Sequence, residues 1–357
     1  MVSTAKRRGG VKDAPPPAPL HEELGLNAET LLDMYYHMVL ARKLDERMWQ
    51  LNRQGKAAFV ISCQGQEAAQ IGTAFAMERG SDWYVPYYRD LGLMLALGQT
   101  PRQVMLSLFA KAEEPNSGGR QMPGHYGFAK SRVLTTGSPV GTQFLHAVGV
   151  GLANKMMRQN REVCAVFGGE GSTSQGDWHE AMNFAAIHKL PVLFIIENNH
   201  YAISVPLELQ VGGQNLAGRA AGYGMVGLAV DGLNPLDCYR AVKAACDRAR
   251  AGEGPTLIEM KCIRITAHSS DDNDRTYRSK ESKEADRLRE PVAFFQGYLL
   301  EHGILTADAD ALLRKRIDGE VEDATDYAEQ APAPVADDLL KHVYATDEEV
   351  AAWRSKH

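Results

Sequence analysis

The chain has 357 residues, of which 44% are hydrophobic and 24% charged, a composition typical of a globular protein with a sizeable core. The formal net charge of −6 includes no basic excess, so we expect no nucleic-acid partner. The longest apolar runs, such as PVLFII from Pro191, are far shorter than the roughly 18 residues of a membrane span, so we expect no membrane partner.

The N-terminal segment and the cysteines bear on the cellular compartment. Residues 1–20 are basic and then proline-rich, without the apolar stretch of a secretory signal, so we predict a disordered tail. Scattered cysteines without a C-x-x-C pair predict reduced core thiols at Cys63, Cys164, Cys238, Cys246 and Cys262. We therefore expect a cytoplasmic protein, or one of the mitochondrial matrix if the source is eukaryotic.

The first folded segments follow helical and then loop patterns. Apolar residues recur at helical spacing at Leu31, Met34, Tyr35, Met38 and Val39. The stretch QGQEAAQIGTAFAM favours a second helix, and the aromatic turn DWYVPYYRDLG comes after it. From Glu113 to Thr136 glycine and polar residues predict a long loop, and such loops in compact domains are usually functional.

An α/β pattern occupies the middle of the chain. EVCAVFG and PVLFIIE each indicate a buried strand, and a helix is predicted between them from Trp178, Ala181, Met182, Ala185 and Ala186. A strand, helix and strand in so few residues predict a parallel pair with a right-handed crossover. We therefore predict an α/β domain over residues 21–305, with a mainly parallel sheet flanked by helices, and a C-terminal helical extension over residues 306–357.

Polar residues follow both predicted strands at the point where each strand ends. Glu170 comes directly after the first strand, and Asn199 follows the second. Because the carboxyl ends of parallel strands meet at one edge of the sheet, where ligands bind, we expect these two residues to lie close together. The neighbouring glycines let the backbone approach a ligand, and the next helix presents its positive end to an anion.

One carboxylate and one amide oxygen are too few ligands to hold Mg²⁺ tightly, but phosphate oxygens and water can complete its octahedron. The pattern therefore predicts a metal-bridged diphosphate. A dinucleotide fingerprint fails because Ser174 stands where a third glycine is required, and no G-K-[ST] closes a P-loop. The alternative is a glycine turn beside a solvated asparagine pair.

The stretch GEGSTSQGDWHEAMNFAAIHKLPVLFIIENNHYAIS resembles the thiamine diphosphate motif, which begins G-D-G or G-E-G and ends N-N. YYRDLG, GRQMPGHYG, TGSPVGTQ, NNHYAIS and HSSDDNDRTYRS occur in the same order as in one family. The chain thus resembles, over about residues 30–305, the α subunit of the decarboxylating component of 2-oxo acid dehydrogenase complexes. The resemblance implies a thiamine diphosphate-binding fold.

The resemblance also implies roles for individual residues. Mg²⁺ would be held by Glu170, the Asn199 side chain and the Tyr201 carbonyl. The diphosphate would be lined by Gly169, Gly171, Ser172 and Arg89, whose guanidinium has the fork geometry that suits phosphate oxygens. Further cofactor contacts would come from Tyr88, Ser138, Val140, Arg264 and His268. Catalytic contacts would come from Tyr88, Ser138 and His268, and His125 is a weaker candidate for one.

Two loops carry further implied roles. A monovalent cation, K⁺, would sit in a loop formed by Gly137, Pro139, Thr142 and Gln143, although an ordinary turn before a helix from Thr142 explains the pattern equally well. The charged segment over residues 268–290 cannot build a core, so we expect a solvated loop that relatives use as a lid, braced here by Arg264 and Tyr277. Ser269 and Ser279 fall near positions that are phosphorylated in mitochondrial relatives.

Two positions depart from the family pattern. His200 stands where many relatives have glycine. Glu197, just before the asparagine pair, stands where some branched-chain relatives carry a basic residue. Because a carboxylate repels a diphosphate, we expect Glu197 to point away from the site or to pair with a cation.

In this family the carboxylate that activates the cofactor belongs to a separate β chain, and about 350 residues leave no room for a second α/β domain. We therefore expect a heterotetramer of two α and two β chains that passes its acyl group to a lipoylated acyltransferase core. G-E-G and RQMPGHY favour branched 2-oxo acids such as 3-methyl-2-oxobutanoate, with pyruvate or acetoin as the alternative. A rival of another class is a non-catalytic nucleotide-binding or scaffold subunit.

Overall fold

The structure is a computed structural model that describes residues 18–159, 161–213, 215–341 and 343–355. The tail predicted for residues 1–20 lies outside the described residues except at its last three positions. Within the described ranges, no helix combines the length and the apolar character needed to cross a membrane.

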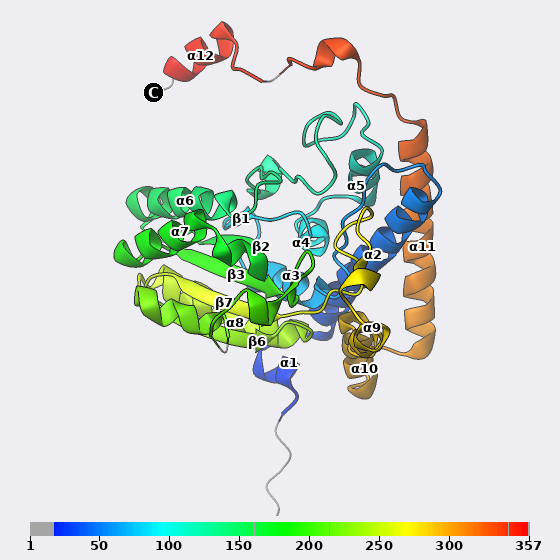
Figure 1. Cartoon of the computed structure of the whole chain (residues 1–357), viewed down its shortest axis with the longest axis horizontal. Helices are drawn as coiled ribbons and strands as arrows, with labels where there is room; N and C mark the ends of the chain where they lie inside the picture. The colour runs from blue at the N-terminus through cyan, green and yellow to red at the C-terminus, as the bar shows by residue number, and fades with distance from the viewer. Residues whose placement is uncertain (1–17, 160, 214, 342, 356–357) are drawn as a thin grey trace, which may run out of the picture.

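A five-stranded parallel sheet forms the centre of the protein (Figure 1). In spatial order its strands are β1 (Trp83–Val85), β2 (Cys164–Gly169), β3 (Val192–Asn198), β7 (Thr256–Lys261) and β6 (Val226–Asp231). A small antiparallel pair follows β3, formed by β4 (Tyr201–Ala202) and β5 (Val205–Pro206). The predicted α/β class with a mainly parallel sheet is confirmed.

Helices cover both faces of this sheet (Figure 1). On one face lie α6 (Thr142–Arg158) and α7 (Gly176–Ile187), and on the other lies α8 (Pro235–Arg250), with α3 (Glu67–Ala76) packed beside it. The other helices are α1 (Leu20–Glu23), α2 (Ala28–Arg53), α4 (Leu91–Ala96), α5 (Pro101–Leu108), α9 (Lys280–Arg287), α10 (Pro291–Glu301), α11 (Ala307–Gln330) and α12 (Asp347–Arg354).

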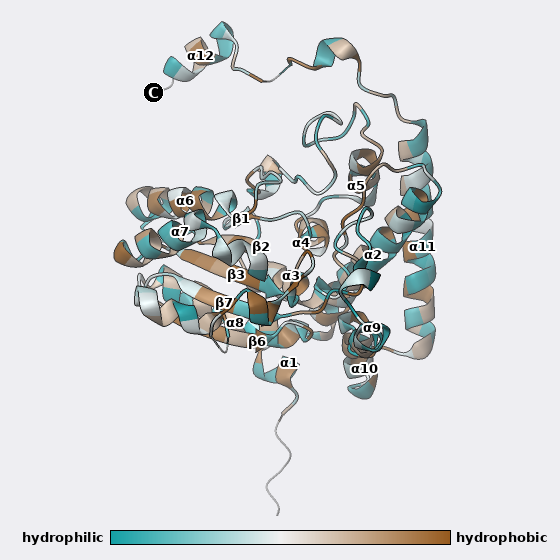
Figure 2. Cartoon of the chain, viewed as in Figure 1, coloured by the Kyte–Doolittle hydropathy of each residue, from teal (hydrophilic) through white to brown (hydrophobic). Residues whose placement is uncertain are grey.

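Successive residues of the central strands point into two separate cores. Cys164 and Val166 pack in the cluster that contains α6 and α7, whereas Ala165 and Phe167 pack in the larger cluster that contains α2, α3 and α8. Side chains of a strand alternate between its faces, so a strand covered on both faces must be apolar at every position. This explains the continuous apolar runs of β2 and β3, which are among the most hydrophobic parts of the molecule (Figure 2).

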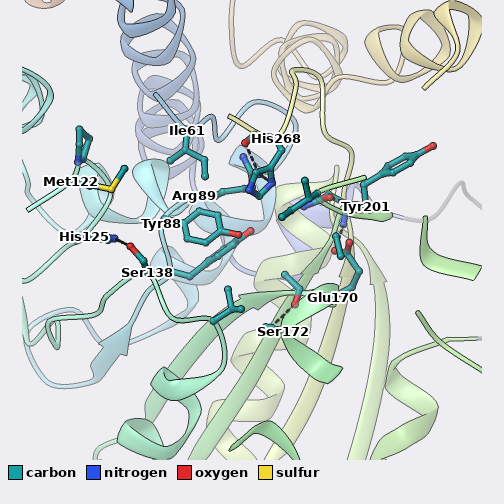
Figure 3. Close-up of a pocket in the computed structure, with 18 of the residues that line it drawn as sticks. Ile61, Tyr88, Arg89, Met122, His125, Ser138, Glu170, Ser172, Tyr201 and His268 are labelled. Atoms are coloured by element: carbon teal, nitrogen blue, oxygen red, sulfur yellow. Dashed lines mark hydrogen bonds between the residues drawn. The ribbon is translucent and has the colours of Figure 1, made fainter. Parts of the chain in front are cut away.

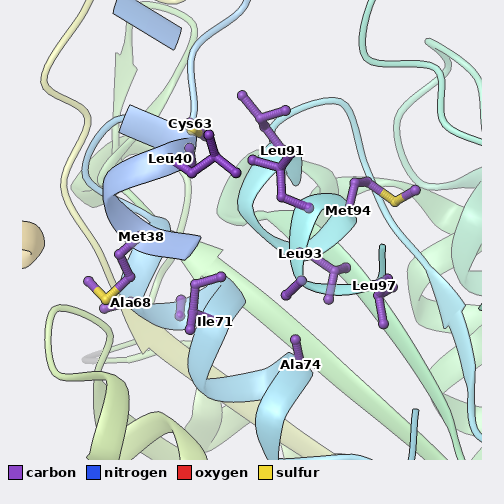
Figure 4. Close-up of a cluster of buried hydrophobic side chains, with 14 of the residues drawn as sticks. Met38, Leu40, Cys63, Ala68, Ile71, Ala74, Leu91, Leu93, Met94 and Leu97 are labelled. Carbon is purple, nitrogen blue, oxygen red and sulfur yellow. The ribbon is translucent and has the colours of Figure 1, made fainter. Parts of the chain in front are cut away.

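The larger core also fixes the turn that carries Arg89. Figure 4 shows the part of this core where α2, α3 and α4 meet, with Ile71 of α3 facing the leucines of α4. Every residue of α4 is buried, and α4 begins two residues after Arg89. The packing of α4 therefore holds the turn that carries Arg89.

The register of β2 and β3 brings their ends together. Val166 pairs with Phe194, and Gly169 pairs with Glu197, so both strands end at the same edge of the sheet. The helix α7 joins them, as the sequence predicts. Glu170 and Asn199 consequently lie beside each other although 29 positions separate them in the chain.

The C-terminal helices lie at the outer edge of the protein. α11 packs against α2 and α5, and its outward face is largely polar (Figure 2). Beyond Gln330 the chain runs away from the helices and ends in α12, which lies apart from the rest of the molecule (Figure 1).

Candidate active site

A cavity of about 430 Å³ opens beyond the carboxyl ends of β2 and β3 (Figure 3). It brings together most of the residues that the sequence singled out: Tyr88, Arg89, His125, Ser138, Val140, Gly169, Glu170, Gly171, Ser172, Asn199, Tyr201 and His268. Other residues assigned roles do not line it, namely Gly137, Pro139, Thr142, Gln143, Arg264 and Tyr277. In Figure 3 Glu170 and Tyr201 lie at one end, Met122 and His125 lie at the other, and Tyr88 lies between them.

Glu170 begins a short 3₁₀ helix, Glu170–Ser174, directly after β2, and its carboxylate is buried. One oxygen, Oε2, accepts a hydrogen bond from the Asn199 backbone N–H at 3.2 Å. The other, Oε1, has no hydrogen-bond partner among the described residues, and the nearby Gln210 amide nitrogen donates instead to the Val205 carbonyl at 2.7 Å. Burial raises the pKa of Glu170 above its ordinary value. A buried, unpartnered carboxylate oxygen is a place for a cation.

Two more oxygens lie in the turn after β3. The Asn199 side-chain oxygen accepts from the Tyr201 N–H at 3.3 Å, and the Tyr201 carbonyl accepts from Arg264 at 3.2 Å, so each retains a lone pair. The turn requires a left-handed residue at position 200, where His200 has φ of 71°, which is a conformation that glycine adopts at no cost. A glycine, which the family resemblance leads us to expect at this position, would adopt the turn without strain.

The donor set of a carboxylate, an amide oxygen and a carbonyl oxygen suits Mg²⁺, a hard cation that prefers oxygen ligands. Within the described ranges no group of three acidic, histidine or cysteine side chains could hold a metal ion. The described residues would therefore offer only part of an octahedral shell, and phosphate oxygens and water would have to supply the rest. The unpartnered Glu170 oxygen fits this arrangement.

The glycines around Glu170 differ in how much space surrounds them. A Cβ at Gly171 would come within 2.6 Å of the Ala202 Cβ, and a Cβ at Gly168 would come within 2.7 Å of Phe144. These two positions therefore allow close packing within the protein. At Gly169 the nearest neighbour of a Cβ would be Tyr87 at 3.9 Å, so packing within the protein does not require glycine there. Gly169 and Gly171 both line the cavity, so the approach of their backbone to a ligand stays a prediction beside this packing role.

Arg89 is buried beneath the cavity, and its guanidinium is held in a fixed orientation. One terminal nitrogen donates to the Ser62 carbonyl at 2.8 Å. The other donates to the His268 carbonyl at 2.9 Å and contacts the His268 ring nitrogen Nδ1 at 3.0 Å. The arrangement places a fixed positive charge on the wall of the cavity, which suits a phosphate.

The contact with Arg89 determines the state of His268. Because a guanidinium only donates hydrogen bonds, Nδ1 must accept, and in the neutral ring the proton is therefore on Nε2. Burial, together with the positive charges of Arg89 and Arg264, lowers the pKa of His268 to about 4. His268 is thus a neutral donor at physiological pH.

A chain of side chains connects this histidine to the turn after β3. Arg264 donates to the Ile203 carbonyl and to the Tyr277 hydroxyl, each at 2.8 Å. The Tyr277 hydroxyl donates to Asp272, which accepts from the His268 backbone N–H at 2.8 Å. Arg264 therefore lies behind the cavity wall and links the segment of His268 to β4.

The segment over residues 268–290 is less solvated than the sequence predicts. Asp274 and Arg278 are buried, and Arg278 donates to the Arg264 carbonyl at 2.5 Å and pairs with Asp286 at 2.6 Å. The expectation of a solvated loop holds for most of this segment, which is exposed or half-buried, but not for Asp274 and Arg278, whose charges are satisfied by other side chains and by backbone groups. Ser269 is also buried, and Ser279 caps α9 by accepting from the Ser282 N–H.

The end of the cavity opposite Glu170 is mainly apolar. The cavity walls also include residues that the sequence analysis did not single out, namely Phe59, Ile61, Met122, Pro123 and Ile203, of which Met122 lies at this end (Figure 3). Met122 and Pro123 lie inside the GRQMPGHYG motif, whereas no pattern in the sequence points to Phe59 or Ile61. His125 contacts the Ser138 hydroxyl at 2.6 Å there, and burial lowers the pKa of His125.

Glu197 lies outside the cavity in a buried polar network. It accepts from Gln70 at 3.2 Å and from the Tyr87 hydroxyl at 3.1 Å. Burial raises the pKa of Glu197 to about 7 and raises the pKa of the neighbouring Asp90 well above its ordinary value. Neutral donors, instead of a cation, hold this carboxylate outside the cavity.

The predicted cation loop lies beside the cavity and is mostly exposed at residues 137–140. The Gln143 side chain is turned inward, where its oxygen accepts from the Gly141 N–H at 3.0 Å and its nitrogen donates to the Phe167 carbonyl at 3.1 Å. The helix α6 begins at Thr142, where the sequence places a helix start.

Comparison with known proteins agrees with the family resemblance found in the sequence. Residues 35–337 match the protein family described as "Dehydrogenase E1 component". The chain is 54% identical to the 2-oxoisovalerate dehydrogenase subunit alpha of Bacillus subtilis, an alignment that covers 91% of this chain and 98% of the relative.

Two further relatives are more distant. The 3-methyl-2-oxobutanoate dehydrogenase subunit alpha of Mycobacterium tuberculosis is 36% identical over 93% of this chain and 88% of the relative. The pyruvate dehydrogenase E1 component subunit alpha of Bacillus subtilis is 35% identical over 89% of this chain and 83% of the relative.

Proposed function

Because the chain belongs to the dehydrogenase E1 component family, we propose that it is the α subunit of the decarboxylating component of a branched-chain 2-oxo acid dehydrogenase complex. Its activity is that of a 3-methyl-2-oxobutanoate dehydrogenase, which decarboxylates a branched 2-oxo acid and transfers the acyl group to a lipoyl group. The cofactor of the reaction is thiamine diphosphate.

The observation that carries this proposal is the buried Glu170 oxygen without a partner, at the edge where β2 and β3 end. With the Asn199 side chain and the Tyr201 carbonyl it would bind Mg²⁺, and the metal would bridge to the diphosphate. Arg89 and Ser172 would hold the other phosphate oxygens. The chemistry that the cofactor supplies there is an electron sink for the decarboxylation.

The remaining cavity residues bind and orient the substrate. Phe59, Ile61 and Met122 line an apolar wall that excludes water and matches an aliphatic side chain. His268 carries a proton on Nε2 and can donate a hydrogen bond without bringing a positive charge into the site. His125 and Ser138 form a hydrogen-bonded pair at the apolar end, where they can contact the carboxylate of the substrate.

A second chain completes the site in this proposal. The described cavity residues include the metal ligands and the phosphate-binding arginine, and Glu170 is the only carboxylate among the residues that line the cavity. A glutamate on the pyrimidine side of the cofactor must therefore come from a β chain. We propose a heterotetramer of two α and two β chains that serves a lipoylated acyltransferase core.

The substrate class follows from the relatives. Identity to the 2-oxoisovalerate dehydrogenase subunit alpha of Bacillus subtilis is 54%, against 35% to the pyruvate dehydrogenase subunit alpha of the same organism. We further propose a cytoplasmic location, since the more similar of these relatives is bacterial. A potassium ion in the loop over residues 137–143 stays a prediction.

The test is decarboxylation with an artificial electron acceptor by the α chain produced together with its β partner. We expect turnover that requires Mg²⁺ and thiamine diphosphate and that prefers 3-methyl-2-oxobutanoate to pyruvate. A preference for pyruvate would overturn the substrate class and retain the chemistry. A well-formed complex that binds no thiamine diphosphate would contradict the whole proposal and favour a scaffold subunit.

A further inference from the structure

Residues 60–65 form a stretch of chain between α2 and α3 that belongs to neither a helix nor a strand. We call it the connecting strip. All of its residues except Ile61 are buried. Buried backbone without regular secondary structure must find its hydrogen-bond partners elsewhere, and those partners determine where it lies. The position of the connecting strip is therefore set by the groups around it.

One buried carboxylate supplies acceptors to the connecting strip. Asp45 lies on α2 with 0% of its surface exposed. Its Oδ2 accepts hydrogen bonds from the Ser62 hydroxyl at 2.8 Å and from the Cys63 N–H at 2.6 Å, and its Oδ1 accepts from the Gln64 side-chain amide at 3.3 Å. A carboxylate is stable in the interior only where donors surround it, and these three donors all belong to the strip. Asp45 thus fixes three consecutive residues of the strip relative to α2.

The connecting strip in turn holds both sides of the Arg89 guanidinium. One terminal nitrogen donates to the Ser62 carbonyl at 2.8 Å. The other donates to the His268 carbonyl at 2.9 Å, and Figure 3 shows the two side chains next to each other at the cavity. The segment of His268 is itself bound to the strip, because the Ser270 N–H donates to the Val60 carbonyl at 2.8 Å and the Val60 N–H donates to the Ser270 hydroxyl at 3.1 Å.

This arrangement bears on phosphate binding because it orders the Arg89 side chain through contacts within the protein. A long side chain that a ligand must first order binds that ligand more weakly than a side chain already held in place. A guanidinium also meets phosphate oxygens well only in a narrow range of orientations, since its donors form a rigid fork. Asp45 does not line the cavity, so it acts on a phosphate only through the strip and Arg89.

We propose that Asp45 is a positioning residue for diphosphate binding: by fixing the connecting strip, it holds Arg89 in the orientation that meets a phosphate. The inference rests on the proposed function, because that function assigns the diphosphate to Arg89. Asp45 touches neither the cofactor nor the substrate, and its whole effect on affinity passes through Arg89.

The test measures how tightly the complex of the α chain with its β partner binds inorganic pyrophosphate and thiamine diphosphate, each with Mg²⁺, by titration calorimetry. Asp45→Leu removes the acceptors and keeps the approximate size of the side chain. Asp45→Asn retains one oxygen that can accept from Ser62 and Cys63. Thermal unfolding of each complex reports on its fold.

The matched control is Asp82→Leu. Asp82 is also 0% exposed and also accepts from backbone N–H groups, those of Val163 and Glu78, each at 2.8 Å. It directly precedes β1, at the edge of the parallel sheet opposite the cavity. The control therefore removes a buried carboxylate of the same kind without touching the connecting strip.

We expect Asp45→Leu to weaken the binding of both ligands by about tenfold and Asp45→Asn to stay within about threefold of the wild type. Asp82→Leu should lower the unfolding temperature and leave both affinities unchanged. Undiminished affinity in Asp45→Leu would overturn the proposal. An equal loss of affinity in Asp82→Leu would overturn it too, because general destabilisation would then explain both results.

A double-mutant cycle with Arg89→Met separates positioning from a merely structural role. Because Asp45 acts through Arg89, Asp45→Leu should cause no further loss of pyrophosphate affinity in a chain that already carries Arg89→Met. A further loss as large as that in the wild-type background would refute the proposal.

Ser62→Ala takes the place of Asp45→Leu in the same cycle if that variant does not fold. It removes only the hydroxyl donor to Asp45 and leaves the Ser62 carbonyl that binds Arg89. A smaller loss of pyrophosphate affinity, absent in the Arg89→Met background, is the expected result, and unchanged affinity in Ser62→Ala would contradict the proposal.

The two proposals fail in different ways. A complex that binds pyrophosphate but not thiamine diphosphate refutes the proposed function and leaves the pyrophosphate cycle to decide the role of Asp45. A complex that binds both ligands equally well with and without the Asp45 carboxylate refutes only the positioning role. A wild-type complex that binds neither ligand refutes both.

Discussion

Two regions line the same cavity and are held in place by different interactions. The ends of β2 and β3, with Glu170 and Asn199, are continuous with a sheet whose strands are buried on both faces. The segment from Arg264 to Arg278 has no strand partner. It is held by side chains that bond to one another and to carbonyl groups, and by backbone hydrogen bonds from Ile265 to Gln64 and from Ser270 to Val60. The first region depends on apolar packing, and the second depends on buried charges.

This difference indicates which part of the site can move independently. Displacing Glu170 requires disrupting the strand ends of the sheet. Releasing His268 requires breaking its contacts with Arg89 and Asp272, the link from Tyr277 to Arg264 and the hydrogen bonds between Ser270 and Val60, none of which belongs to the sheet. We therefore expect the metal-binding side to be rigid and the His268 side to open at lower free energy. The following substitutions test this division.

The largest effect on the fold is expected from Gly171→Val. An added Cβ would meet the Ala202 Cβ at 2.6 Å, so the 3₁₀ helix after β2 and the strand β4 must separate. We expect the free energy of unfolding to fall by about 1–3 kcal/mol. Thiamine diphosphate binding should be lost as well, since both elements carry proposed metal ligands. Denaturant unfolding and titration calorimetry check the two effects, and wild-type stability in the variant would contradict this account of the strand end.

A smaller effect on stability, confined to the second region, is expected from Arg264→Met. The substitution removes donors to the carbonyls of Tyr201 and Ile203 and to the Tyr277 hydroxyl. We expect a loss of about 1–3 kcal/mol, toward the lower end because the methionine retains the packing. Limited proteolysis should cleave the segment over residues 265–290 faster.

The control for this prediction is Arg275→Met. Arg275 is exposed in the same segment, and its substitution should change neither stability nor cleavage. Equal cleavage rates in the two variants would show that the Arg264 contacts do not hold the segment.

The smallest effect concerns pH and His268. Its pKa is lowered to about 4 from an ordinary value of 6.5, so between these values the unfolded chain binds more protons than the folded chain. The contribution of the neutral His268 ring to the free energy of unfolding is therefore fully present above pH 6.5 and is lost as the pH falls toward 4. In His268→Gln the decline of the unfolding free energy over this range should be shallower than in the wild type. An identical decline would show that the ring titrates normally in the folded protein.

The sequence predicted the first region well because its signals are local. Continuous apolar runs indicate β2 and β3, and the rule that parallel strands end at one edge of the sheet places Glu170 beside Asn199, as the structure confirms. The resemblance to a family added Arg89, Ser138 and His268, which no local pattern identifies, and the structure places all three on the cavity.

The second region was predicted less well for a physical reason. A run of mixed charges indicates a solvated loop, but here Asp274 and Arg278 are buried because their partners come from Lys283, Asp286 and the Arg264 carbonyl. Such partnerships depend on the three-dimensional arrangement and leave no periodic pattern. The same holds for Phe59 and Ile61, which reach the cavity from a loop far away in the sequence.

The central claim is that Glu170 binds a metal that holds a diphosphate, and the most direct test is the affinity for thiamine diphosphate with and without Mg²⁺. Calorimetry would compare the wild-type complex with Glu170→Gln, which keeps the size of the side chain and removes its charge. The matched control is Glu197→Gln, since Glu197 is also buried but does not line the cavity. We predict Mg²⁺-dependent binding in the wild type and the control, and a loss of about 100-fold or more in Glu170→Gln. Undiminished Mg²⁺-dependent affinity in Glu170→Gln would contradict the account.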